Sequence, residues 1–331
     1  MGTSQGHGAS RVKSTPLGVT GPLVSAVGLG GSALGGVFGH VEESSAIATV
    51  QAALEAGITL FDTAPAYGAT RSETLLGRAL QGAPRSSYAL STKAGKNTLP
   101  TGEDLFDYSE TAIRSSVDAS LERLGTNYLD VVHLHDFDYE GGRHVEQALA
   151  EGFPTLLALK REGVIRAVGA GIYFMPLWKR VLTQVSLDVV LLHNHHTLCD
   201  VRAYELLPLL EERGVAPINA APFASGLLTG AEPAPWHPVP ASARALLKRA
   251  AALAASRGSS LSRLALQFSS SEPRLPLTLF SCADPATLRT NLAWLEEDPD
   301  LELVADVQRI LEPIMNMQWP YGSSPAHEDF S

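Results

Sequence analysis

Four side chains whose types suit proton transfer follow apolar runs in the first half of the chain. Asp62 ends the run ITLFD and is followed by Tyr67, Lys93 comes directly after YALST, and His135 ends YLDVVHLH. A carboxylate at the end of a buried strand is costly unless a cation pairs with it. An ammonium beside a phenol also lowers the pKa of the phenol. We therefore expect Asp62 to hold Lys93, and Lys93 to lower the pKa of Tyr67.

A tyrosine with a lowered pKa can serve as a general acid or base near neutrality, which an ordinary tyrosine, with a pKa near ~10, does poorly. His135 can hydrogen-bond a substrate oxygen and polarise it. Together these groups could manage the proton of an alcohol or carbonyl oxygen while another molecule takes or gives a hydride. Each residue alone has a structural interpretation, as an architectural ion pair or a packed histidine. Their occurrence at successive strand ends favours the catalytic one.

The elements that must position these groups alternate along the chain. Strand-like runs occupy residues 23–29, 58–62, 88–92, 128–135, 165–170, 187–193, 215–220 and 276–280. They are nearly continuous in Val, Ile, Leu and Ala, which is typical of parallel strands buried on both faces. Helix-period segments lie between them, with expected N-caps and closing glycines at Ser44 or Ser45, Ser109, Gly57, Gly125 and Gly214. This alternation predicts an α/β fold, a single-domain (β/α)8 TIM barrel spanning residues 19–331.

An open, doubly wound sheet is the alternative architecture. Its mark would be a G-x-G-x-x-G turn after the first strand, whereas residues 28–33 read GLGGSA, which is off that pattern. A flexible turn packed under a ligand or loop is the favoured interpretation. The proline-rich stretch at residues 230–241 follows a strand end, so we expect a surface excursion that could cover a site.

Composition limits the classes of partner. The chain has 331 residues and a net charge of −10, with no run of basic residues, which argues against nucleic acid and anionic membrane surfaces. No apolar run approaches the ~20 residues of a membrane span, and the first residues lack the apolar core of a signal peptide. Two cysteines suit a reducing compartment. We expect a cytoplasmic protein, a monomer or weak homodimer, with a disordered segment over residues 1–18.

The stretches around the four groups resemble the aldo-keto reductases. The landmarks, spread between Leu23 and Met317, are GITLFDTAPAYGATRSETLLGRAL, STKAG, RSSVDASLERLGTNYLDVVHLHD, LKREGVIRAVGAGI, APFASGLLTG and DPATLRTNLAWLE. The resemblance implies a barrel that uses a nicotinamide cofactor. It also implies that Tyr67 is the general acid/base, with Asp62, Lys93 and His135 in the roles argued above.

Further segments resemble a sugar-oxidising branch of that family: GGVFGHV, LLHNHHTLCD, PWHP and ILEPIMNMQWPYG. Members of that branch oxidise an aldose at its anomeric carbon to a lactone with NAD, either L-galactose in ascorbate synthesis or the related L-fucose and D-arabinose. Loops after the strands would then select the sugar, and aromatic faces suit the apolar side of a pyranose. The substrate contacts expected, besides Tyr67 and His135, are Phe38, Asn194 and Trp236, with Phe223 and Trp319 as further candidates.

The resemblance also implies a cofactor site. APFASGLLTG is similar to the loop that wraps the pyrophosphate, which places Ser225, Gly226 and Leu227 against it. NADP-using relatives carry cations where this chain has Ser281 and Thr287, and a carboxylate between them at Asp284 would repel a 2′-phosphate. NAD is therefore expected, with Arg289 as counter-evidence. The remaining expected cofactor contacts are Asp62, His193 and Asn291.

Several alternatives stay open. The histidines of residues 193–196 could form a metal site, but sugar binding or packing is favoured and no metal is expected. Cys282 in the cofactor segment has a packing role by default. The chain could instead be an NADPH-dependent aldehyde or ketone reductase, or a cofactor-binding regulatory subunit of a membrane channel.

Overall fold

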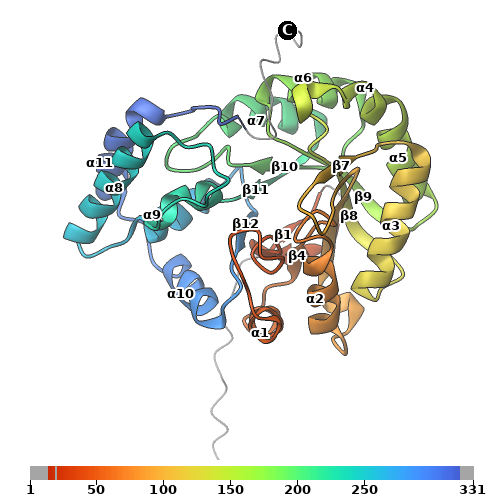
Figure 1. The fold of residues 1–331 in the computed structure, drawn as a ribbon, viewed down its shortest axis with the longest axis horizontal. Coiled ribbons are helices and arrows are strands. Elements are labelled where there is room, and N and C mark those ends of the chain that lie inside the picture. The colour runs from red at the N-terminus through yellow and green to blue at the C-terminus, as the bar shows by residue number, and fades with distance from the viewer. Residues whose placement is uncertain (1–13, 19–20, 321–331) are drawn as a thin grey trace, which may run out of the picture.

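The computed structural model describes residues 14–18 and 21–320, and its centre is a closed barrel of eight parallel strands (Figure 1). The strands are β3 (Val27–Gly30), β4 (Leu60–Asp62), β5 (Ala89–Ala94), β8 (Leu129–His135), β9 (Ile165–Ile172), β10 (Val189–His193), β11 (Ala216–Ala220) and β12 (Thr278–Ser281). Strand β12 pairs with β3 and so closes the sheet on itself. The predicted TIM barrel is confirmed, and the open doubly wound sheet is excluded.

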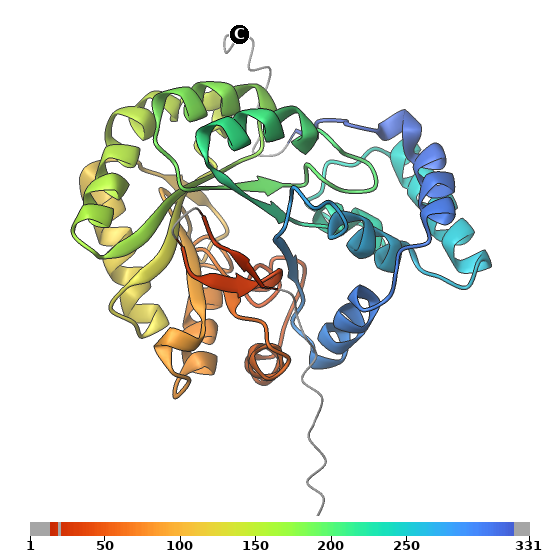
Figure 2. The same ribbon diagram turned by 180° about the vertical axis from the view of Figure 1, so that it is seen from behind.

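Helices surround the barrel, as Figures 1 and 2 show from opposite sides. They are α1 (Glu43–Glu55), α2 (Arg71–Leu80), α3 (Glu110–Leu124), α4 (Val145–Gln147), α5 (Phe153–Arg161), α6 (Met175–Gln184), α7 (Ala203–Arg213), α8 (Ala241–Ser256), α9 (Leu261–Ser269), α10 (Pro285–Leu295) and α11 (Leu301–Leu311). Among the described residues, no helix combines the length and apolar character that crossing a membrane needs.

Alternate side chains of the strands fill the barrel interior. Leu60, Val131, Val189, Ile218 and Leu279 belong to one buried cluster there. The intervening side chains belong to a larger cluster with the helices that face the outside of the barrel. Since both faces are covered by apolar groups, the strands need no polar alternation, which explains their continuous apolar runs.

Most helix ends follow the predicted caps. The Ser109 hydroxyl accepts from the Ala112 N–H at 3.3 Å at the start of α3, and Gly125 ends that helix with φ 65°. Gly214 ends α7 in the same left-handed conformation, with φ 64°. Helix α1 differs, because it begins at Glu43 and the Ser45 hydroxyl donates to the Ala283 carbonyl at 2.7 Å instead of capping the helix.

The N-terminal part differs from prediction. Residues 23–29 do not form one strand, because β2 (Leu23–Ser25) turns to pair antiparallel with β1 (Ser14–Pro16) before β3 begins. Of the segment 1–18 that was predicted to be disordered, residues 14–18 lie in the described part of the chain and include β1, while residues 1–13 lie outside it. Leu17 and Gly18 line a hollow together with Asp130 and Asp188, so the hairpin lies at the N-terminal end of the barrel strands.

Two excursions follow strand ends. A hairpin of β6 (Lys96–Thr98) and β7 (Asp104–Phe106) follows the end of β5. The proline-rich stretch follows η4 (Ala224–Thr229), and its Trp236 indole N–H donates to the Val37 carbonyl at 3.2 Å. This stretch therefore crosses to the loop after β3, as a segment that covers the barrel mouth should. It leads into α8, which packs with α9 and α11 in a separate cluster.

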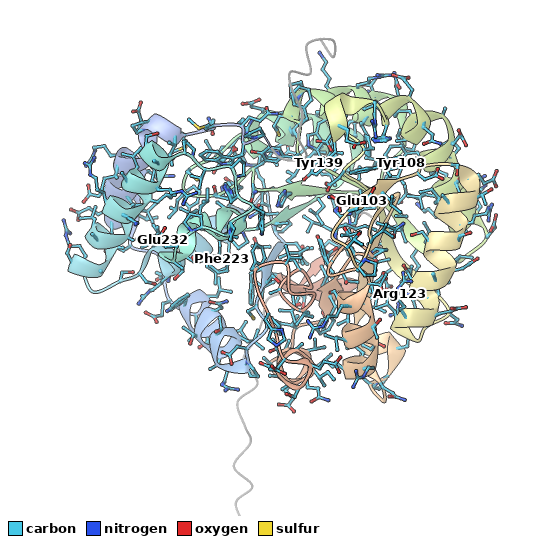
Figure 3. The ribbon with its side chains drawn as sticks, viewed as in Figure 1. Glu103, Tyr108, Arg123, Tyr139, Phe223 and Glu232 are labelled. Carbon is cyan, nitrogen blue, oxygen red and sulfur yellow. The ribbon has the colours of Figure 1, made fainter. Side chains whose placement is uncertain are left out.

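A buried ion pair ties α2 and α3 to β5. The Glu73 carboxylate is fully buried and accepts from the Arg123 guanidinium and the Thr92 hydroxyl, both at 2.6 Å (Arg123 is labelled in Figure 3). Arg123→Met leaves this carboxylate buried without its cation, so we expect the free energy of unfolding to fall by about 3–5 kcal/mol. Urea unfolding followed by circular dichroism measures this loss.

The matched control is Arg78→Met, which breaks a pair with Glu43 in which both side chains are more than half exposed. We expect a change below about 1 kcal/mol there, because water screens such pairs. Equal losses in the two variants would contradict the structural role assigned to Glu73.

Candidate active site

The strand register places the predicted groups on one interior layer. Asp62 is two residues beyond Leu60 on the interior face of β4, and His135 is four residues beyond Val131 on β8. Side chains two or four residues apart on a strand share a face. Lys93, four residues beyond the interior Ala89 on β5, joins the same layer. The strand ends therefore bring a carboxylate, an ammonium and an imidazole together at the carboxyl end of the barrel.

The Asp62 carboxylate is fully paired in its buried position. Its Oδ1 lies 2.6 Å from the Lys93 Nζ, and its Oδ2 accepts from the Ser91 hydroxyl at 2.7 Å. Lys93 also donates to the Thr63 carbonyl at 2.8 Å and is only 1% exposed. These bonds offset the cost of burying both charges and fix the ammonium in place.

Tyr67 reaches this pair from the turn after β4. A Cβ on Gly35 would lie 2.6 Å from the Tyr67 carbonyl oxygen, and one on Gly68 would lie 2.0 Å from the Gly35 carbonyl oxygen, so two glycines permit the close approach of these loops. The Lys93 Nζ lies 4.9 Å from the centre of the Tyr67 ring. The His135 ring meets the tyrosine edge-on, with 6.0 Å between ring centres. All four predicted groups are thus together.

The protonation of Tyr67 differs from prediction. Burial raises the pKa of the phenol, and this exceeds the lowering by the Lys93 ammonium, so the net pKa lies above the ordinary value. The expected net lowering is therefore wrong, because sequence reasoning counted the charge but not the desolvation of a phenolate. Near neutrality Tyr67 is a neutral phenol that is ready to donate its proton.

The two neighbours of Tyr67 differ in charge, since Lys93 is a cation and His135 is neutral. Burial alone lowers the pKa of Lys93, but Asp62 and Tyr67 together more than reverse this, so the group stays an ammonium. Burial lowers the pKa of His135 to about 3, despite the nearby Asp136 carboxylate. His135 is therefore a neutral imidazole at physiological pH, able to hydrogen-bond a substrate oxygen without adding a charge.

The loops after β10 and β11 meet beside this centre. The Asn194 side-chain amide, on a residue with φ 64°, donates to the Ser225 hydroxyl at 2.8 Å. Asn194, predicted as a substrate contact, therefore lies against the predicted cofactor loop. Burial lowers the pKa of the adjacent His193 to about 4, and charges on Lys93 and Asp136 act on this imidazole, so it lies near the catalytic groups.

The predicted pyrophosphate loop has two residues in left-handed conformation, and one of them has open space beside its backbone. Ser225 and Gly226 have φ of 54° and 97°, while Leu227 is buried beneath them. A Cβ added to Gly226 would meet no atom within 4 Å, so the backbone here is accessible from outside. Left-handed residues in succession turn backbone N–H groups toward a common point, which suits an anion.

The predicted adenosine segment follows β12. The Ser281 hydroxyl is occupied, since it donates to the Gly30 carbonyl at 2.7 Å and accepts from the Ala33 N–H at 2.8 Å. Asp284 is the N-cap of α10, and its Oδ2 accepts from the backbone N–H and the hydroxyl of Thr287. Arg289 is exposed and close enough to help lower the pKa of Asp284. Asn291, two residues further along α10, is buried.

Aromatic groups stand at the rim. Phe38 and Trp236 have ring centres 6.0 Å apart, and both are nearly half exposed. Arg71 holds the loop that carries Phe38 by donating to the Leu34 and Val41 carbonyls. Phe223, labelled in Figure 3, is partly buried beside η4.

Other side chains singled out in the sequence are structural. Trp319 is buried with its backbone N–H donating to the Tyr173 hydroxyl at 2.9 Å, so it is not an exposed rim residue. His195 stacks on Tyr173 and His196 stacks on Phe268. Within the described ranges, no three acidic, histidine or cysteine side chains gather in a way that could hold a metal ion. Burial raises the pKa of the Cys282 thiol to about 12, so this thiol is not a reactive thiolate.

Sequence reasoning missed two charged residues at this site. Asp136 directly follows His135, and its carboxylate lies 3.6 Å from the His135 Nε2. Lys96 lies 2.9 Å from Asp136, on the hairpin three residues beyond Lys93. The adjacency of Asp136 to a strand-end histidine was the signal available. The position of Lys96 depends on the β6–β7 hairpin, which no apolar pattern indicated.

The chain belongs to the aldo/keto reductase family, whose pattern matches residues 26–312. It is therefore an oxidoreductase, and the resemblance seen in the motifs is confirmed. It is similar to L-galactose dehydrogenase of Arabidopsis thaliana, with 38% identity over 95% of this chain and 98% of that protein. It is also similar to D-threo-aldose 1-dehydrogenase of a Pseudomonas species, with 35% identity over 64% of this chain and 70% of that protein.

Further relatives differ in reaction. NADH-specific methylglyoxal reductase of Escherichia coli is 30% identical over 91% of this chain and the whole of that protein. Among solved structures, an aldo-keto reductase from Bacillus halodurans in its holo form matches with a TM-score of 0.74 and 25% identity, over 95% of this chain and all of that one.

Proposed function

We propose that this protein is an NAD-dependent aldose 1-dehydrogenase that converts an aldose, with L-galactose the first candidate, to its aldonolactone. The observation that carries this proposal is the cluster of Tyr67, Lys93, Asp62 and His135 in one layer at the barrel mouth. The similarity to two sugar dehydrogenases supports an aldose as the substrate. The lactone of L-galactose links the reaction to ascorbate synthesis, as the motif resemblance implies. Two buried free cysteines support a reducing, cytoplasmic location.

The residues present fit a nicotinamide cofactor. The accessible backbone at Gly226 suits a pyrophosphate, and the N-cap carboxylate of Asp284 suits a free ribose hydroxyl rather than a 2′-phosphate. Asn291 would face the adenine, and His193 would lie near the reacting end. The bound cofactor supplies the hydride acceptor of the oxidation.

The protein's own groups handle the proton. The anomeric hydroxyl of the sugar hydrogen-bonds to Tyr67 and to the neutral His135. As the C1–H bond breaks, Tyr67 in its phenolate form accepts the hydroxyl proton, and Lys93 stabilises the phenolate with Asp62 behind it. The C1 oxygen becomes the lactone carbonyl, so the step needs no protein nucleophile. Phe38 and Trp236 would cover the sugar and exclude water.

A sugar panel with both cofactors tests the proposal. Purified protein is given L-galactose, L-fucose, D-arabinose and D-glucose with NAD or NADP, and reduced nicotinamide is followed by absorbance. We expect L-galactose, L-fucose or D-arabinose with NAD to give the highest kcat/KM. Preference for NADP would contradict the role given to Asp284, and the absence of any aldose oxidation would overturn the proposal.

The rate of oxidation should rise with pH. The base form of Tyr67 is a minority species, since burial raises the pKa of the phenol above its ordinary value despite Lys93. We therefore expect kcat for oxidation to increase with pH, by up to about tenfold per unit, between about pH 6 and pH 9. Steady-state rates at saturating sugar and NAD measure the slope. A rate that falls over this range would contradict Tyr67 as the base.

Carbonyl reduction by the same site is a second candidate. The neutral phenol of Tyr67 is the form needed to protonate a carbonyl oxygen, and the similarity to NADH-specific methylglyoxal reductase favours this direction. Rates with methylglyoxal and NADH, compared with aldose oxidation at the same pH, distinguish the two activities.

A further inference from the structure

Beside the four catalytic groups lies a buried ion pair that the reaction above does not use. The Asp136 carboxylate lies 2.9 Å from the Lys96 Nζ, and its side chain is 15% exposed. Lys96 is also 3.1 Å from Asp104 on the second strand of the hairpin. A pair with this little exposure gives weak stabilisation at best, because both ions lose water on burial. Its place next to His135 points to a role in recognition.

A left-handed backbone conformation places Asp136 beside His135. Asp136 has φ 52°, in the left-handed region that, apart from glycine, mainly Asn and Asp adopt, and its N–H donates to the Gly171 carbonyl at 3.0 Å. Strained conformations of this kind cost roughly 1–3 kcal/mol and cluster at functional sites. The turn brings the carboxylate back over the strand end, so that it lies 3.6 Å from the His135 Nε2.

The charges of this pair are fixed. Burial raises the pKa of Asp136, but His135 and Lys96 lower it to about 2, so the group is a carboxylate at physiological pH. Burial lowers the pKa of Lys96, but its two carboxylate partners raise it well above the ordinary value. The Lys96 Nζ also lies 4.4 Å from the centre of the Tyr139 ring, which restrains its stem.

The two oxygens of this carboxylate differ in their partners. Lys96 engages Oδ2, and in the described part of the chain no side chain or backbone group donates to Oδ1. The carboxylate lies 3.6 Å from the His135 imidazole, and its charge also raises the pKa of Tyr67 and of His193. Tyr139, whose ring the Lys96 ammonium contacts, is labelled in Figure 3 near Tyr108.

We propose that Asp136, held by Lys96, is a specificity-determining residue that accepts a hydrogen bond from the sugar hydroxyl next to the anomeric carbon. This inference rests on the proposed function. If His135 bonds the anomeric oxygen, the hydroxyl on the neighbouring carbon is the group within reach of a carboxylate 3.6 Å from that imidazole. Lys96 keeps the acceptor ionised and turned toward the sugar. The substrate class is therefore an aldose with a free 2-hydroxyl.

The test measures kcat/KM for each aldose that the enzyme oxidises and for the 2-deoxy analogue of that aldose. Both sugars are given to the wild type and to the Asp136→Asn variant. Asparagine tolerates the left-handed backbone and keeps the shape of the side chain, so the fold should survive. We expect the wild type to prefer the hydroxylated sugar by about ten- to hundredfold in kcat/KM, the usual worth of a hydrogen bond to a charged group. In Asp136→Asn the preference should shrink to a few-fold, mainly through a higher KM for the hydroxylated sugar.

Glu232→Gln is the matched control, because it neutralises an exposed carboxylate that is paired with Lys248. In Figure 3 Glu232 lies on the opposite side of the view from Tyr139. It should leave the preference unchanged. If Asp136→Asn slows both sugars equally, Asp136 acts only by orienting His135 and the inference is wrong. An unchanged preference in an active enzyme would overturn the inference alone, whereas a wild type that oxidises no aldose would overturn the proposed function and the inference with it.

Discussion

Replacing Tyr67 with phenylalanine should lower kcat for aldose oxidation by about 10²–10⁴-fold, the usual contribution of a positioned general acid or base. The change removes one hydroxyl from a ring that is held by its turn and by the edge-on contact with His135. NAD binding should be nearly unchanged, because the hydroxyl handles the substrate proton. The pH dependence of the remaining rate should also disappear. Steady-state kinetics over pH, with NADH binding followed by fluorescence, give both readouts.

Tyr88→Phe is the matched control. Tyr88 directly precedes β5, at the opposite end of the strand from Lys93, and its ring packs edge-on against Phe61. Loss of this hydroxyl should leave kcat within about twofold, as for a surface change remote from the chemistry. If Tyr67→Phe kept most of the activity, the proton would pass through another group, and the roles given to Lys93 and Asp62 would fail together.

The fold was predictable because its strands are buried on both faces. The apolar runs that end at Asp62 and His135 could be neither surface strands nor long helices, and glycines such as Gly125 and Gly214 marked helix ends by their backbone freedom. The two outer hairpins were not predictable. Their strands are only three residues long, too short for a periodic pattern, and tertiary contacts rather than propensity hold them.

The candidate site was predictable for residues on the strands, because alternate side chains of a strand point to the same face. Counting residues along β5 and β8 places Lys93 and His135 on the interior face. Asp62 needs a cation in its buried position, and this requirement indicated Lys93 as its partner. The net pKa of Tyr67 was not predictable, since desolvation depends on depth and not on spacing. Asp136 was missed because its adjacency to His135 in the sequence does not show that a left-handed backbone turns the carboxylate back toward that imidazole.

Lys93→Met should abolish most activity and also destabilise the barrel. The ammonium is 1% exposed, and its removal leaves the Asp62 carboxylate buried without its cation. Breaking such a pair costs about 3–5 kcal/mol in unfolding free energy. Oxidation should slow by about a hundredfold or more, because the phenolate of Tyr67 loses the charge that stabilises it. Urea unfolding and steady-state kinetics measure the two effects separately.

The double variant Asp62→Asn/Lys93→Met separates charge burial from catalysis. Removing both charges leaves no unpaired buried ion, so stability should recover by roughly half or more of the loss, while activity stays low. Lys160→Met is the control for loss of a lysine, since its pair with Asp188 is partly exposed and should cost below about 1 kcal/mol. If the double variant regained activity together with stability, the ion pair would serve the architecture alone, and the acidity of Tyr67 would need another source.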